Sequence, residues 1–389
     1  MTQARGSNTQ VGYQEETTFA TIPASPALKT LYFASENFAE KIAVNASNVI
    51  RNSRNPVMPT RGARDVSASI KTELSPQIGT LLRAAIGSNT TTGETSPYTH
   101  TMKVGTLPSL IFEKGFTGLA AYLLYLGCKV NKMSISVRPT GYQEVSFDLL
   151  GAYEAQALKY DGQTGNFAAG LMASGGTSLH TGRIKGDNDG GVSGTLVLID
   201  STGVFQNNEA LTDTGTGAAV VDGTLGDSSI DSSHTDPGHT PFDGFSISTI
   251  QEGGSDIAYL SAVDLILENN LDGNSYVIGG GGIRREIPEG LAKVSGTITA
   301  LFESMALYRK AISFAESSLK IIWTLGTGAG TAGNESLEIL VPELKLSKET
   351  PVIDGPGGIL YKGPFEAYYN DSAQVSTIQA ILKNAEATV

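Results

Sequence analysis

Cysteine is almost absent from this chain, and long hydrophobic runs are missing altogether. Cys128 is the only cysteine, which excludes an intrachain disulfide and a zinc site built from thiolates. The longest apolar-leaning stretch without charge lies between Lys114 and Lys129 and is shorter than the roughly 20 residues that a membrane helix needs. The first ten residues, MTQARGSNTQ, lack the apolar centre of a signal peptide. We therefore expect a protein made in a cytoplasm, with no membrane partner.

Catalytic and metal-binding signatures are also missing. The chain has no P-loop, no HExxH, no GxSxG and no thiol pair. His234 and His239 lie beside Asp231 and Asp236 in DSSHTDPGHTPFD, but this stretch has the composition of turns and no periodic scaffold to fix metal ligands. The acidic stretch GDNDGG lacks the later glutamate of an EF-hand loop. We therefore expect no enzyme, no cofactor and no metal.

One glycine motif does match a cofactor site. Residues 328–333 have the GxGxxG spacing of a dinucleotide-binding turn, which needs a strand before the glycines and a helix after them. Here apolar residues alternate on both sides of the glycines, at 319–323 and at 337–341, which is typical of strands. Pro342 then removes a backbone donor, and we expect the second strand to stop there. The motif therefore predicts a wide β-hairpin rather than a nucleotide site.

Glycine is abundant in this sequence and charge is scarce. The 46 glycines make up about 12% of the 389 residues, against about 7% in ordinary proteins, and charged residues reach only 17%. This composition is typical of a β-rich protein with many turns. The net charge of -12 repels phosphate backbones, so we expect no sequence-specific nucleic-acid binding. The length favours two domains, or one domain with a large insertion.

Hydrophobic periodicity predicts antiparallel strands, including a hairpin whose turn is PTG at 139–141. Two short helices accompany them, so the core is mainly β or α+β rather than doubly wound. The strands are expected at 66–74, 133–137, 145–149, 258–268 and 294–302.

The first helix follows the first of these strands. Ser75 is expected to cap it, Pro76 fits its first turn and Gly87 ends it. The second helix is predicted in ESMALYRKAISFAE, and its spacing places four residues on the buried side: Met305, Tyr308, Ile312 and Ala315.

Composition changes sharply at 156–245, where Gly, Ser, Thr, Asp and Asn dominate around one strand-like run, TLVLIDSTGVF. Eleven acidic and three basic residues give this segment -8 of the total -12. We interpret 156–245 as an inserted, peripheral β-rich domain, and 1–155 with 246–389 as one discontinuous domain. A flexible low-complexity loop is the alternative, because the segment can supply only a small core.

The order of several loose motifs carries a resemblance. GYQEETTF is followed by TLLRAAIGS, YLGCKVNKMSISV, VSGTITALFE, LEILVPEL and GPFEAYY. This succession resembles the tail tube proteins (major tail proteins) of long-tailed bacteriophages, over roughly residues 10–155 and 246–389. The family tolerates extra immunoglobulin-like domains, although 156–245 has no Cys or Trp signature of a true one.

The resemblance implies a structural role in a virion. In that family, hexameric rings of antiparallel β-sandwich or barrel domains join their sheets edge to edge, and stacked rings make a hollow tail tube through which DNA passes during ejection. Ring closure also pairs strand edges that would otherwise be exposed. The implied partners are further copies of the chain and the tape-measure, tail-terminator and distal-tail proteins, with assembly in the bacterial host cytoplasm. A capsid decoration protein or a host-surface adhesin with a β-sandwich domain is the alternative.

Within that frame, some carboxylates are expected to line the channel without binding DNA specifically. Strand alternation places them opposite the core, and a solvated outward face is the alternative. The candidates are Glu144, Asp148, Asp264 and Glu268. An insert too large for the channel would lie outside the tube, which favours a flexible, non-contractile (siphophage) tail.

A basic cluster in RNSRNPVMPTRGAR is the candidate contact between rings. Its prolines and glycine predict a long loop, and the family keeps an extended loop here that reaches the neighbouring ring. Arginine can pair carboxylates through two hydrogen bonds. The alternatives are a solvated loop, and contact with DNA in the lumen, which would retard the genome. The candidates are Arg51, Arg54, Arg61 and Arg64, with Glu15 and Glu16 as acidic partners and Tyr13 and Phe19 as apolar anchors.

Overall fold

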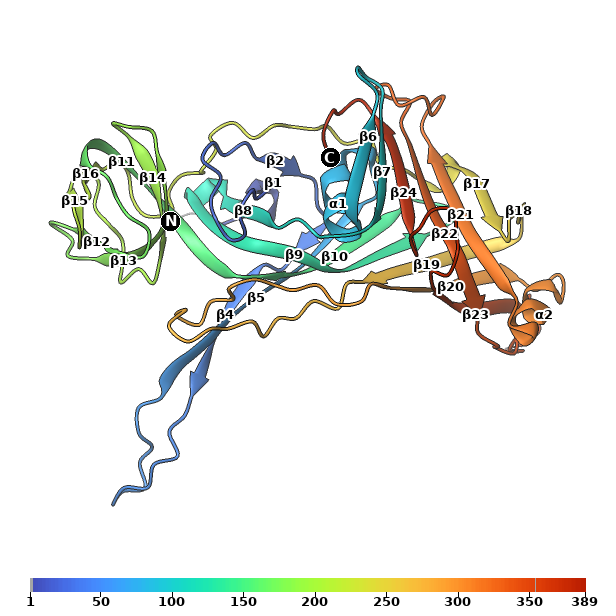
Figure 1. The fold of residues 1–389 in the computed structure, drawn as a ribbon, viewed down its shortest axis with the longest axis horizontal. Coiled ribbons are helices and arrows are strands. Elements are labelled where there is room, and N and C mark those ends of the chain that lie inside the picture. Colours follow the sequence, from blue (N-terminus) through green and yellow to red (C-terminus); the bar gives the residue numbers. More distant parts are fainter. Residues whose placement is uncertain (1–2, 354) are drawn as a thin grey trace.

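The computed structural model describes residues 3–353 and 355–389. Strands account for 47% of the chain and helices for 7%, which confirms the prediction of a mainly β fold with short helices. Figure 1 shows a body of long antiparallel strands, a small separate group of strands at one end, and a narrow hairpin that leaves the body.

The strands before the insert are β1 (Thr9–Glu15), β2 (Lys29–Leu31), β3 (Ser35–Glu36), β4 (Ala39–Asn45), β5 (Thr60–Glu73), β6 (Gly87–Thr92), β7 (Tyr98–Val104), β8 (Leu110–Phe116), β9 (Ala121–Val137) and β10 (Glu144–Gly151). Those of the insert are β11 (Tyr153–Gly165), β12 (Met172–Gly175), β13 (Thr181–Asp189), β14 (Gly194–Ile199), β15 (Ala210–Asp213) and β16 (Ala218–Val221). The last group comprises β17 (Ile247–Glu252), β18 (Ser255–Asp256), β19 (Leu260–Glu268), β20 (Lys293–Leu301), β21 (Glu316–Thr324), β22 (Ser336–Leu346), β23 (Leu360–Ala367) and β24 (Gln379–Asn384).

The main sheet runs through strands from both halves of the chain, in the order β4, β5, β10, β9, β19, β20, β23 and β22. Strands such as β10 and β19 alternate buried and more exposed residues, so one face of the sheet covers the core and the other is open, whereas β4 at the edge has no buried residue. The buried face packs on one large cluster that includes Phe147, Leu265 and Ile298. The predicted hairpin of β9 and β10 is confirmed, with Ile135 opposite Val145.

The GxGxxG segment is a hairpin loop between β21 and β22, as predicted, with Ile321 opposite Ile339. The loop glycines Gly328, Gly330 and Gly333 all adopt positive φ, which glycine takes without steric cost. The prediction that the second strand stops at Pro342 was wrong, because β22 continues to Leu346. The β21 pairing shifts register at the proline, and the neighbour on the other edge changes from β24 to β23, so the missing donor falls at a break in the ladder.

Both predicted helices form, as α1 (Gly79–Ile86) and α2 (Ala306–Ser313). Pro76 opens the 3-10 turn that leads into α1, but Ser75 makes no capping hydrogen bond through its side chain. The buried side predicted for the second helix was wrong in part, although Tyr308 does pack against the main core. Leu307 and Ala311 are its buried residues, since α2 begins only at Ala306 and the i, i+4 pair inside it faces the sheet. The predicted Met305 and Ile312 are 40% and 55% exposed.

The insert contains its own antiparallel sheet, formed by β11 to β16 around a cluster that includes Tyr160, Leu198 and Phe205. After β16 the chain returns along the main domain. Gly226 donates to the Ala157 carbonyl over 2.7 Å, and Phe242 is fully buried beside Trp323 in the main core. Across the described residues no helix has the length and apolar character to span a membrane.

Candidate assembly surfaces

The open face of the main sheet, here called the polar face, holds all four carboxylates predicted to line a channel. Glu144 and Asp148 alternate with buried residues of β10, and Asp264 and Glu268 do so in β19. β9 lies between these two strands and brings the carboxylates together in cross-strand rows. Glu144 and Asp264 both lie opposite Ser136 of β9.

Cations accompany these carboxylates. Lys71 Nζ lies 2.9 Å from a Glu144 carboxylate oxygen, and Arg138 Nη2 lies 2.7 Å from Asp264 Oδ1. The paired side chains are about half exposed, so each pair contributes only about 0 to 1 kcal/mol. Hydroxyls fill much of the remaining face, which is therefore hydrophilic and of mixed charge. They belong to Ser134, Ser136, Ser146, Ser295, Thr297 and Thr299.

The second surface is a hairpin arm formed by β4, β5 and the loop 46–59 between them, which extends away from the body (Figure 1). Arg51 and Arg54 lie in this loop and are exposed. Arg51 Nη2 donates to the carbonyls of Asn55 and Pro56, each over 3.1 Å, and these bonds close the loop on itself.

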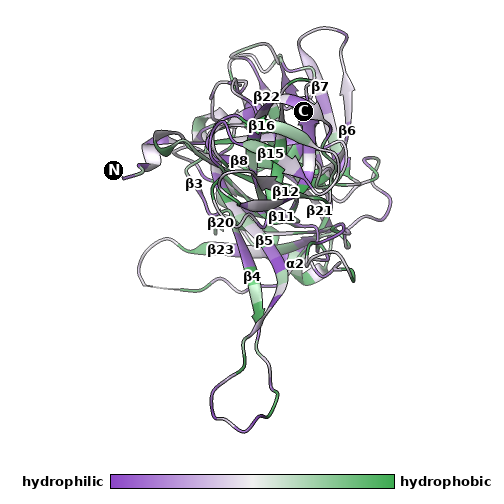
Figure 2. Cartoon of the chain, turned by 90° about the vertical axis from the view of Figure 1, so that its left-hand side faces the viewer, coloured by the Kyte–Doolittle hydropathy of each residue, from purple (hydrophilic) through white to green (hydrophobic). Residues whose placement is uncertain are grey.

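The arm loop also exposes large hydrophobic side chains, a feature that the sequence analysis did not single out. Val49, Ile50 and Met58 are 70%, 97% and 83% exposed. Figure 2 shows the loop beyond the end of β4, with hydrophobic and hydrophilic stretches along it. Apolar residues inside a Pro- and Asn-rich loop were the signal in the sequence that could have identified them. Exposed apolar groups at the tip of a projecting hairpin are typical of a surface that contacts another molecule.

Arg61 and Arg64 lie in β5, so the prediction that all four arginines belong to a loop was wrong for these two. Arg64 is 2% exposed, and its guanidinium pairs with Glu40 over 2.9 Å and with Asp200 of the insert. Arg61 pairs with the same Asp200 carboxylate. Burial pushes the pKa of Asp200 up, but the hydrogen bonds and charges of the two arginines outweigh it and hold that pKa below its usual value. These arginines join the insert to the base of the arm within one chain.

The predicted N-terminal partners are also engaged within the chain. Glu15 pairs with Arg83 over 2.6 Å, and Tyr13 is buried against Phe112 with ring centroids 5.9 Å apart. Phe19 is half-buried on the cluster beneath β9 and β11.

Glu16 is 6% exposed and accepts backbone hydrogen bonds from Ala20 and Gly127 over 2.9 and 2.8 Å. Burial raises the pKa of Glu16 to about 6, although these hydrogen bonds pull it down. The structure therefore does not bring Glu15 and Glu16 together with Arg51 and Arg54.

The histidine and aspartate side chains of the return segment have structural partners. His234 lies 3.4 Å from the buried Glu113, and His239 Nε2 lies 2.8 Å from Glu73. Asp231 accepts from the Leu28 amide over 2.8 Å, which fixes the return segment against the main domain. In residues 3–353 and 355–389 no three His, Cys, Asp or Glu side chains form a group that could hold a metal ion.

The family model described as phage tail tube protein matches residues 6–367, which is most of the chain. No curated protein matches the sequence. The matched range includes the polar face, the arm and the insert.

Proposed function

Because the chain belongs to the phage tail tube protein family and is a structural component of the virion tail, we propose that its copies close into rings, and that stacked rings form a hollow tube through which DNA passes during ejection. The tube is made in the host cytoplasm and meets the tape-measure protein inside and the terminator and distal-tail proteins at its ends.

The observation that carries this proposal is the polar face of the main sheet. One face of the main sheet, from β5 to β22, is buried on the core, while the other presents Ser, Thr and paired charges to solvent. Such a face suits the wall of a channel, since it is wetted and carries no dense basic patch that would hold phosphates. Lumen placement of Glu144, Asp148, Asp264 and Glu268 follows from this assignment.

Stacking of rings is assigned to the arm. Its loop combines Arg51 and Arg54 with the exposed Val49, Ile50 and Met58. The apolar groups gain free energy when they are covered, and the arginine forks select carboxylates on the ring above or below. Arg61 and Arg64 instead hold the arm and the insert in position.

Negative-stain electron microscopy of the purified chain tests the proposed function. We expect rings and hollow tubes of uniform diameter. A chain that stays monomeric under all ionic conditions, and that is absent from the tail shaft of purified virions when gold-labelled antibody is applied, would contradict the proposal.

A further inference from the structure

The two halves of the main domain repeat one order of elements. In the first half, the antiparallel strands β4 and β5 are joined by a long loop, and the eight-residue helix α1 follows β5. In the second half, β19 and β20 are likewise antiparallel and joined by a long loop, and the eight-residue helix α2 follows β20. In both halves the helix leads through further strands back to the main sheet.

The strand pairings repeat as well. Six antiparallel pairings of the first half have counterparts in the second half, between strands that hold the same place in the order. The pairs β1–β8, β8–β9, β9–β11, β9–β10, β10–β5 and β5–β4 correspond to β17–β21, β21–β22, β22–β24, β22–β23, β23–β20 and β20–β19.

A β-bulge recurs at the same place in both halves. Leu110 and Phe112 of β8 lie opposite Cys128 and Tyr125 of β9, so two steps on one strand face three on the other. Ser317 and Leu319 of β21 lie opposite Leu344 and Val341 of β22, with the same two-to-three mismatch. A bulge is a specific local feature, so this coincidence indicates duplication rather than a shared general architecture.

Short sequence matches agree with this alignment. VSASI at 66–70 in β5 corresponds to VSGTI at 294–298 in β20. KVNK at 129–132 in β9 corresponds to KLSK at 345–348, which begins at the end of β22. Both matches fall on strands that the pairing order already equates.

The junction between the halves shows how one module joins the next. In the order of the main sheet, β9 is the edge strand of the first module and pairs with β19, the edge strand of the second. At the outer edges of the main sheet, β22 with its continuation is the equivalent of β9, and β4 is the equivalent of β19. Within the described residues, β4 pairs only with β5, which leaves its outer edge open. Residues 347–353, which correspond to the paired part of β9, form no strand.

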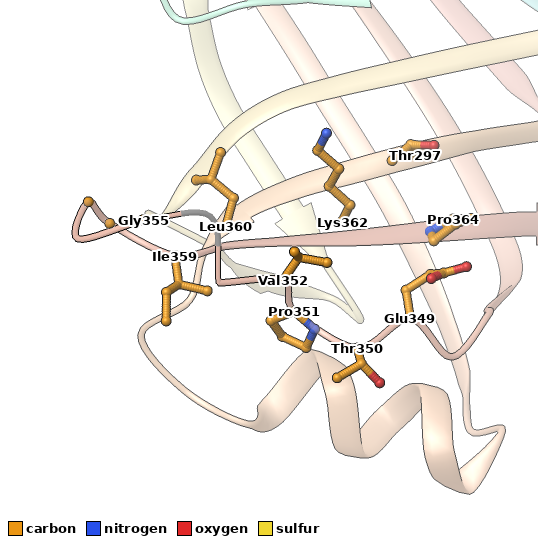
Figure 3. Close-up of a pocket in the computed structure, with 12 residues that line it drawn as sticks. Thr297, Glu349, Thr350, Pro351, Val352, Gly355, Ile359, Leu360, Lys362 and Pro364 are labelled. Carbon is orange, nitrogen blue, oxygen red and sulfur yellow. The ribbon is translucent and has the colours of Figure 1, made fainter.

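Both open elements expose apolar side chains. Ile42 and Val44 on β4 are 42% and 72% exposed, and Val352 and Ile353 are 75% and 76% exposed. The segment around Val352 borders a cleft of about 720 Å³, which Thr297 and Lys362 also line. Figure 3 shows the side chains that line this cleft. Val137, the counterpart of Ile353 at the internal junction, is 3% exposed.

We propose that this chain carries two copies of one tube module, and that a second copy of the chain covers each open end by pairing its β4 edge with residues 347–353. This contact repeats between chains the β9–β19 junction found within the chain. This inference rests on the function proposed above. A ring of six modules then contains three chains rather than six. The arm and the insert, present once per chain, would follow three-fold symmetry on a tube wall of nearly six-fold form.

The alignment fixes the register of the contact. Ile266 lies opposite Ser134 at the internal junction. Ala39 holds the place of Ile266, since each lies opposite the second residue of its VS motif. Thr350 holds the place of Ser134, because each lies two residues after the second lysine of its motif, KLSK or KVNK. Ala39 of one chain should therefore face Thr350 of the next.

The test is disulfide formation in assembled tubes that carry both Ala39→Cys and Thr350→Cys. Directly opposed positions in paired strands satisfy the about 4.4 to 6.8 Å between Cα atoms that a disulfide needs. The native Cys128 is buried and does not compete. After oxidation, a non-reducing gel should show a ladder that ends at three linked chains, and electron microscopy of end-on rings should show three-fold symmetry for the insert.

Matched controls make the register part of the test. Each single variant should give no ladder, and pairing Ala39→Cys with Glu349→Cys should link poorly, because neighbouring residues of a strand point to opposite faces. A ladder that extends to six chains would overturn the proposed three chains per ring. Intact tubes without cross-linking would overturn the proposed pairing of β4 with residues 347–353. The absence of any ring or tube would count against the proposed function instead.

Discussion

Asp148 of β10 and Glu268 of β19 lie opposite the same residue, Lys132 of β9, on the polar face. Lys132 Nζ lies 3.8 Å from Glu268 Oε1. The row therefore runs acid, base, acid across three neighbouring strands. In the proposed lumen, a phosphate would meet a carboxylate on both sides of Lys132, which weakens retention of DNA.

Reversing the two outer charges of this row should slow DNA ejection. With Asp148→Lys and Glu268→Lys, the two new lysines join Lys132 and Lys293 in one row of four. Tails carrying the variant should eject DNA several-fold more slowly at low salt. The difference should shrink as salt rises, because the screening length falls from about 30 Å at 0.01 M to about 10 Å at 0.1 M. Ejection is followed by dye fluorescence after receptor addition. Adding Glu144→Lys and Asp264→Lys should enlarge the effect.

Asp161→Lys with Asp222→Lys is the matched control, since both carboxylates are exposed on the insert. This pair changes the net charge equally and should leave the rate unchanged. Equal slowing by both pairs of substitutions, or by neither, would count against placement of the polar face in the lumen.

The arm prediction separates stacking from folding. Arg51→Glu with Arg54→Glu should change the free energy of unfolding by no more than about 0.5 kcal/mol, because both residues are exposed. Rings should still form but should not stack, which electron microscopy and sedimentation measure. Arg183→Glu, at an exposed site of the insert, should leave tubes intact. Tubes of normal length from the arm variant would show that these arginines do not join rings.

Arg64 should matter for stability rather than for stacking. Arg64→Ala leaves Glu40 and Asp200 without their buried cation, and we expect it to cost about 3 to 5 kcal/mol in urea unfolding of the protomer. Arg61→Ala, at a more exposed site, should cost about 0 to 1 kcal/mol. Similar losses for both variants would contradict the assignment of Arg64 as the buried link.

Much of the fold could be predicted from local patterns, and the failures have physical reasons. Alternation identified β5, β10 and β20 because each has one buried and one solvated face. The polar face could be predicted for the same reason. The roles of Arg64 and Glu16 could not, because their partners Asp200 and Gly127 lie more than 100 residues away in sequence. Charge alone suggested exposure for groups that are buried with specific partners.

Glu16 should make stability depend on pH. Its pKa is about 6 in the folded chain and 4.5 in the reference state, so between these values the folded state holds a proton that the unfolded state releases. The free energy of unfolding should therefore fall as pH rises from 4.5 to 6, by about 2 kcal/mol from this group. Urea unfolding of the native chain and of Glu16→Gln gives the free energy of unfolding of each at a series of pH values. The difference between the two proteins isolates the contribution of Glu16, which should not change above about pH 7. Parallel curves for the two proteins would rule this out.

The last prediction concerns the insert, which we place on the outer surface of the tube because a domain of this size would obstruct the channel. A deletion that joins Glu154 to Ser246 would also remove Phe242 from the main core and Asp231 from its bond to Leu28. The structure offers a better junction, since Gly226 donates to the Ala157 carbonyl over 2.7 Å.

Deleting 158–225 and linking Ala157 to Gly226 through a short glycine-serine turn therefore keeps the return segment in place. The deletion has two further consequences. Arg64 loses Asp200 but keeps Glu40, so its charge stays paired. The apolar contacts that Val197 and Ile199 make with the main domain are lost, and a polar substitution at Ala155 limits the exposed patch. We expect this variant to form rings and tubes with a thinner outer profile and an unchanged lumen in electron micrographs. A soluble, folded variant that forms no rings would place the insert in the interface between chains instead of on the outer surface.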